Sequence, residues 1–182
     1  MFTDLQKRKL IRYFHVLDSD RNGYLEKADF DQILRNLAEL RGWKPGTAHF
    51  TALEAGVMSI FGNTVKHADK DGDGRCTLDE WFGMEEEVLG TPENFRLYSL
   101  DVAKGLFDVI DFDLDGEIGS QEWVNFFHAF CRLPVGAALE SFTHLDKNGD
   151  GRLTKDEILE LVREFHYSDD PAAPGNWLFG RW

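Results

Sequence analysis

The chain has 182 residues, 42% of them hydrophobic, with 15 Phe and 5 Trp, which is enough for one large domain or two small ones around a sizeable core. Its formal net charge of −13 argues against binding to nucleic acids or anionic lipids, because their phosphates would be repelled. Much of the acid lies in four short runs, which indicates cation binding rather than a general solubilising surface.

The first residues lead into an amphipathic pattern instead of an unbroken apolar one, so we expect no signal peptide. No stretch approaches the roughly 18 apolar residues that a membrane span needs. We therefore expect a cytoplasmic monomer that binds neither membranes nor nucleic acids. A protein partner stays open.

Four twelve-residue segments share an acidic pattern with a central glycine. They start 51, 42 and 35 residues apart, so they do not form a uniform array. In chain order they are DSDRNGYLEKAD at 18–29, DKDGDGRCTLDE at 69–80, DFDLDGEIGSQE at 111–122 and DKNGDGRLTKDE at 146–157.

Apolar residues flank each segment at offsets of three and four, which places each set on one face of a helix. After the fourth segment, for example, they are Ile158, Leu161, Val162 and Phe165. Turn residues at 41–47, 90–93 and 133–136 separate the four units. The sequence thus predicts an all-α fold of four helix–loop–helix units.

The segments suit Ca²⁺, a hard cation that takes six to eight oxygen ligands at roughly 2.3–2.6 Å. Side chains at positions 1, 3 and 5 supply oxygens, and position 7 supplies its backbone carbonyl. Position 6 is glycine because the turn needs a backbone conformation that a Cβ disfavours. Position 9 often acts through water, and a bidentate Glu at position 12 closes the shell.

All four loops keep most of these ligands. In the third loop, position 9 is Gly119, which has no side chain, so we expect water to take that place. In the fourth loop, Asn148 at position 3 keeps the ligand oxygen but lacks the negative charge of Asp. The predicted ligands at positions 1, 3, 5, 7 and 12 are Asp18, Asp20, Asn22, Tyr24 and Asp29 in the first loop; Asp69, Asp71, Asp73, Arg75 and Glu80 in the second; Asp111, Asp113, Asp115, Glu117 and Glu122 in the third; and Asp146, Asn148, Asp150, Arg152 and Glu157 in the fourth.

The first loop departs at position 12, where Asp29 is one methylene shorter than Glu. The shorter side chain either contacts the ion with one oxygen only or draws the exiting helix toward the ion. Fewer ligands at shorter distances favour octahedral Mg²⁺. Glu26 at position 9 would partly compensate. We expect Ca²⁺ at three or four loops, with Mg²⁺ exchange as an alternative at the first.

Position 8 is apolar in every loop: Leu25, Cys76, Ile118 and Leu153. In paired loops these residues meet in a short two-stranded contact, so Cys76 is interpreted as a pairing residue and not as a metal ligand. We expect two pairs in one compact globule, with boundaries at 1–89, 90–166 and a docked tail at 167–182. The tail carries Trp177, Leu178, Phe179 and Trp182.

The loops, their irregular spacing, the aromatic helices and the tail DDPAAPGNWLFG together resemble the sarcoplasmic calcium-binding protein group, and within it bacterial calerythrin-like EF-hand proteins. The resemblance covers nearly the whole chain. It implies two EF-hand pairs and Ca²⁺ buffering or transport in the cytosol. Proteins of this group commonly have one degenerate hand, whereas all four loops here keep most ligands.

Several functions stay open. Only 3 Met are present, which argues against a sensor that opens a Met-rich groove to a protein partner, because stiff aromatics suit a permanently packed core. A calcium buffer or store is favoured over such a sensor. Luciferin-binding proteins and calcium-regulated photoproteins look similar, and Trp123, His166 and Tyr167 are possible cavity walls, although packing explains them more simply. No catalytic motif is present, so we expect no enzyme.

Overall fold

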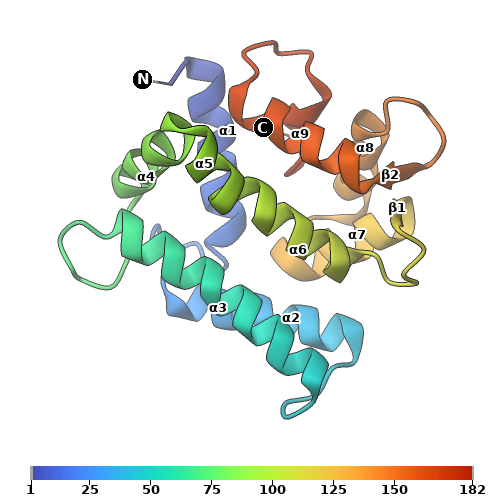
Figure 1. Cartoon of the computed structure of the whole chain (residues 1–182), viewed down its shortest axis with the longest axis horizontal. Coiled ribbons are helices and arrows are strands. Elements are labelled where there is room, and N and C mark those ends of the chain that lie inside the picture. Colours follow the sequence, from blue (N-terminus) through green and yellow to red (C-terminus); the bar gives the residue numbers. More distant parts are fainter. Residues whose placement is uncertain (1, 182) are drawn as a thin grey trace.

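The computed structural model describes residues 2–181, apart from the side chain of Lys66. Helices dominate this part of the chain, with one short antiparallel sheet (Figure 1). The elements are α1 (Asp4–Leu17), α2 (Lys27–Arg41), α3 (Ala48–Ala68), α4 (Leu78–Gly90), α5 (Pro92–Phe95), the π-helix η1 (Arg96–Leu100), α6 (Asp101–Ile110), β1 (Glu117–Gly119), α7 (Ser120–Cys131), α8 (Val135–Leu145), β2 (Arg152–Thr154), α9 (Lys155–Tyr167) and the 3₁₀ helix η2 (Pro174–Trp177).

Threonines begin several helices by accepting hydrogen bonds from otherwise unpaired backbone N–H groups. Gln6 N–H donates to Thr3 Oγ1, and Thr3 N–H donates to the Gln6 side chain, which makes a capping box. Asn94 N–H likewise donates to Thr91 Oγ1, and Pro92 occupies the first turn of α5. The predicted break between the second and third units therefore lies where expected.

The π-helix η1 was not predicted. It joins α5 to α6, and Asp101 N–H donates to the Arg96 carbonyl across its wider turn. No turn residue or glycine marks this segment in the sequence. Its wider turn moves the following residues around the axis, which changes the face that α6 presents to the interior.

The loops pair as predicted. Leu25 and Cys76 exchange two backbone hydrogen bonds of 2.9 and 3.0 Å. Ile118 of β1 faces Leu153 of β2 in the antiparallel sheet. All four position-8 side chains are fully buried.

The two pairs of units share one hydrophobic core. The helix α2 packs on α7, and α1 packs on both α4 and α9, so each pair contacts the other along two helices. In Figure 1 the helix α6 crosses the middle of the molecule between α3 and α9. The predicted all-α globule of two paired EF-hands is confirmed. No helix in the described part of the chain is long and apolar enough to cross a membrane.

The tail folds back onto α8 and α9 through η2. Trp177 stacks on His144 with 3.8 Å between ring centroids, and Phe179 stacks on Tyr13 at 4.3 Å. Gly175 lies so close to α9 that a Cβ there would meet the Leu161 carbonyl oxygen at 2.5 Å. Trp182, which was expected to dock as well, lies outside the described residues.

A buried lysine ties the tail to the first helix. The ammonium of Lys9 donates to the Glu164 carbonyl, to the Ser168 carbonyl at 2.8 Å and to Asn176 Oδ1 at 3.1 Å. Both Lys9 and Asn176 are almost completely buried. Two of these three acceptors belong to the tail, so undocking the tail would leave the buried charge with the Glu164 carbonyl alone.

Candidate functional site

Each loop folds its backbone around the side chain at position 1. The central glycine takes a positive φ of 82–87° and donates its N–H to that carboxylate at 2.9–3.0 Å in all four loops. The N–H of position 7 donates to the side chain at position 5 at 2.8–2.9 Å. This ring of donors turns the oxygens of positions 1, 3 and 5 toward the loop centre.

Position 12 lies at the third residue of each exiting helix, where a carboxylate accepts from the first backbone N–H groups. In the third loop Phe112 and Gly119 donate to the two oxygens of Glu122 at 2.5 and 2.8 Å. In the second loop, hydrogen bonds led by that from Thr77 N–H lower the pKa of Glu80. These hydrogen bonds therefore favour the ionised form of Glu80, which a cation ligand requires.

The first loop reaches the same arrangement with the shorter side chain. Ser19 N–H donates to Asp29 Oδ1 at 2.8 Å, and Glu26 N–H donates to Oδ2 at 2.9 Å. Asp29 is 1% exposed, against the half-buried Glu122. Burial is also the largest effect on Asp18, whose pKa it raises. The closing carboxylate of the first site is thus more enclosed than that of the third.

Three of the loops gather carboxylate oxygens within 4.8 Å of one another. The groups are Asp18, Asp20 and Asp29; Asp69, Asp71 and Asp73; and Asp111, Asp113 and Glu122. Like charges so close repel unless a cation lies between them. Asp111 Oδ1 is buried and has no hydrogen-bond partner among the described residues. These oxygen-rich sets fit Ca²⁺ or Mg²⁺.

The fourth loop differs in its centre. Asn148 Nδ2 donates to Glu157 Oε1 and to Asp150 Oδ2, each at 3.0 Å. The amide hydrogens therefore face the position that a cation would take, and the oxygen must turn inward for Asn148 to act as a ligand.

Two arginines at position 7 connect the loops, which the sequence reasoning missed because that side chain was taken as free to vary. Arg75 Nε lies 3.2 Å from Glu26 Oε2 in the first loop. Arg152 Nη1 lies 3.0 Å from Asp115 Oδ2 in the third loop and also contacts Glu117. The recurrence of Arg at position 7 in loops two and four was the available signal.

A third arginine comes from the other half of the molecule. Arg41, at the end of α2, stacks on Phe112 in the third loop with 3.9 Å between the guanidinium and the ring centroid. Burial lowers its pKa, and the nearby charges of Asp111 and Glu122 oppose that shift. The positive charge of Arg41, which belongs to the first hand, therefore lies close to the ligands of the third loop.

Four helix–loop–helix units, paired through position 8, with oxygen ligands around a glycine turn, define an EF-hand protein. Family models agree: the EF-hand domain pair matches residues 7–84, and the EF hand matches residues 139–162.

Comparison with individual proteins identifies a narrower group within the EF-hand proteins. Calerythrin from Saccharopolyspora erythraea is 31% identical over 92% of this chain and 95% of its own length. A sarcoplasmic calcium-binding protein from Scylla paramamosain is 28% identical over 97% and 94%. The solved sarcoplasmic calcium-binding protein from amphioxus shares the fold with a TM-score of 0.78, at 19% identity over the whole of both chains. A calcium-binding protein from Streptomyces coelicolor also shares it, with a TM-score of 0.73 at 24% identity over 88% of this chain and 98% of its own. The chain belongs to the calerythrin-like sarcoplasmic calcium-binding group of EF-hand proteins, and it is a calcium-binding protein.

Proposed function

We propose that the protein buffers or stores Ca²⁺, with ions at three or four loops, and that the first loop also exchanges Mg²⁺. The ligands are those named from the sequence at positions 1, 3, 5, 7 and 12. The chain divides, in this proposal, into hand pairs at 1–89 and 90–166 with a docked tail at 167–182, acting as a cytoplasmic monomer.

The docked tail is the observation that best supports a buffering role. A sensor must uncover an apolar face when Ca²⁺ binds. Here η2 and Phe179 already cover the apolar sides of α1, α8 and α9, and the buried Lys9 is bonded to tail oxygens. Opening that face would cost the burial of several aromatic rings together with an unpaired charge.

A calorimetric Ca²⁺ titration with and without millimolar Mg²⁺ tests the proposal. We expect three or four Ca²⁺ per chain, one of them weakened by Mg²⁺. Asp29→Glu should raise the Ca²⁺ preference of the first loop, with Glu122→Asp as the matched change in the third. Unchanged affinities in Asp29→Glu would refute the Mg²⁺ assignment.

Hydrogen exchange of the tail separates buffer from sensor. For a buffer, the backbone amides of η2 stay protected in both the Ca²⁺-free and the Ca²⁺-loaded protein. If Ca²⁺ removes protection of Asn176 and Leu178, the tail is released on binding and the protein acts as a sensor.

A further inference from the structure

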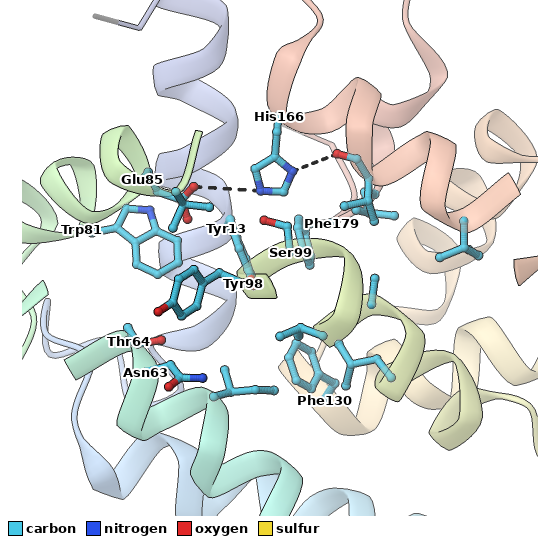
Figure 2. A pocket seen from close by; sticks show the side chains of 18 of the residues that line it. Tyr13, Asn63, Thr64, Trp81, Glu85, Tyr98, Ser99, Phe130, His166 and Phe179 are labelled. Carbon is cyan, nitrogen blue, oxygen red and sulfur yellow. Dashed lines mark hydrogen bonds and ion pairs between the residues drawn. The ribbon is translucent and has the colours of Figure 1, made fainter. Parts of the chain in front are cut away.

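An internal cavity lies where the two hand pairs meet, bounded by α1, α3, α4, η1, α6, α7, α9 and the tail (Figure 2). Its empty space, mouth included, is about 1050 Å³, and the centres of water molecules can occupy about 110 Å³ of it. An apolar cavity of roughly 150 Å³ holds one benzene ring. The enclosed part of this space therefore suits about one aromatic ring, and a larger molecule would extend into the mouth.

Eight of the 24 residues that line the cavity are Phe, Trp or Tyr. Among them, Trp81 and Trp123 are 2% and 1% exposed. Tyr13, stacked on Phe179, and Phe130 from α7 contribute further rings (Figure 2). Flat aromatic molecules pack well against such rings, by stacking or edge-to-face contact.

Two buried donors in this wall lack acceptors. The Nε1–H groups of Trp81 and Trp123 have no hydrogen-bond partner within the part of the chain that the structure describes. A buried indole N–H normally finds a partner, and leaving one unpaired is costly. An acceptor oxygen on a bound molecule would satisfy either group.

A polar pair stands at the end of the cavity near α4 and α9. His166 Nδ1 lies 2.8 Å from the Val162 carbonyl, so this nitrogen carries the proton and Nε2 is left as an acceptor. Nε2 lies 4.0 Å from Glu85 Oε2, which has no hydrogen-bond partner among residues 2–181 (Figure 2). That separation is too long for a direct hydrogen bond, and a hydroxyl placed between them could bridge it.

The cavity carries no formal charge near neutral pH. Burial raises the pKa of Glu85 to about 8 and lowers the pKa of His166 to about 4. Both side chains are then neutral, and an ion entering this space would lose its hydration without gaining a counter-charge. An uncharged molecule is the suitable occupant.

Access lies between α3 and the η1–α6 segment. Several half-exposed lining residues come from these two elements, among them Asn63, Ser99 and Ala103. The Tyr98 hydroxyl and His67 Nε2, 2.5 Å apart, join the two elements beside this opening. The π-helix therefore shapes the rim.

We propose that this cavity binds one uncharged, flat aromatic molecule of one or two fused rings bearing a carbonyl or hydroxyl oxygen, held by the indole N–H groups of Trp81 and Trp123 and by Glu85 and His166. This goes beyond the proposed buffering role, and it does not depend on how many loops bind Ca²⁺.

The probe is prodan, an uncharged naphthalene ketone, added to the full-length protein at saturating Ca²⁺. We expect saturable binding of one prodan per chain, a blue-shifted emission and energy transfer from tryptophan. Ala103→Trp should fill the cavity and abolish binding, whereas Leu139→Trp, at a position 48% exposed on α8, should leave it unchanged. Unsaturable binding, or full binding by an Ala103→Trp variant that titrates Ca²⁺ normally, would overturn the proposal.

A pair of indole variants tests the hydrogen bonds without relying on a filled cavity. Trp81→Phe and Trp123→Phe keep an aromatic ring but remove the N–H. At least one should weaken prodan about tenfold while leaving 2-(dimethylamino)naphthalene, the same ring system without the ketone, unaffected. If neither variant discriminates between the two probes, the assigned donors are wrong. The calcium titration is run on every variant, so failure of the cavity and failure of the buffering role give separate results.

Discussion

The two loop pairs have the same twelve-residue pattern but different contacts across each pair. In the first pair a single bridge joins the loops, and Arg75 holds Glu26, whose position usually acts through water. In the second pair three residues of each strand align, and Arg152 holds Asp115, itself a proposed ligand. The ligand pattern of a loop therefore does not fix its electrostatics, because the partner loop supplies part of its surroundings.

The largest expected effect is on the free energy of unfolding, and it tests the two buried contacts between paired loops. Leu25→Ala and Leu153→Ala each remove a fully buried side chain, and each should lower the free energy of unfolding by about 2–5 kcal/mol. Because the pairs share one core, urea unfolding of the Ca²⁺-loaded protein should remain a single transition in both variants. Two transitions in either variant would show that the pairs are separate folding units.

The next comparison concerns the closing ligand. Glu122→Gln removes the charge that should bind Ca²⁺ through both oxygens, and we expect the affinity of the third loop to fall by about 100-fold. Asp29→Asn should cost the first loop less Ca²⁺ affinity, since we propose that this site also exchanges Mg²⁺ and binds Ca²⁺ more weakly. Site-resolved NMR titration distinguishes the loops, and equal losses would remove the proposed difference between them.

The pairs also meet at Glu85 of α4 and His166 of α9. Burial raises the pKa of Glu85 from its usual 4.5 to about 8, so the folded protein holds this proton more tightly than the unfolded chain does. The stabilisation that the protonated Glu85 provides is complete below pH 4.5. From pH 4.5 up to about 8, the free energy of unfolding should fall by about 1.4 kcal/mol for each pH unit. Glu85→Gln should remove that slope.

The stability difference between Glu85→Gln and the unmodified protein, measured by urea unfolding at saturating Ca²⁺, isolates this group. His166, whose pKa is lowered, gives the opposite slope between about 4 and 6.5 in both proteins and so cancels. A difference that does not change from pH 5 to pH 8 would mean that Glu85 is ionised in the folded state.

The smallest effect concerns the two arginines. Arg152→Gln frees Asp115 and should raise the Ca²⁺ affinity of the third loop about two- to fivefold, because an exposed ion pair competes weakly with the ion. Arg75→Gln should change the first loop less, since Glu26 is a secondary ligand. Both effects should shrink at high salt. A lower affinity in Arg152→Gln would indicate that the arginine positions Asp115 for binding.

The sequence predicted the local features well, because a calcium loop is set by residues within twelve positions of one another. Position 8 predicted that paired loops would meet through buried apolar residues, while the choice of pairs followed the order of the hands along the chain. It did not predict the cavity, which depends on how helices distant in the chain pack together. Trp123 and His166 were considered as wall residues and do line it, whereas Tyr167 is 46% exposed and lies outside it. Nothing in the sequence marked Glu85, because a buried acid on a helix resembles a surface one until its neighbours are known.

The bonds from Lys9 to the tail also bear on how the protein matures during synthesis. Its acceptors lie 155, 159 and 167 residues further along the chain. A ribosome adding about 5–20 residues per second needs on the order of ten to thirty seconds to produce them. Until then α9 and the tail cannot cover the nascent first hand. Its aromatic rings stay exposed and can contact chaperones and neighbouring nascent chains.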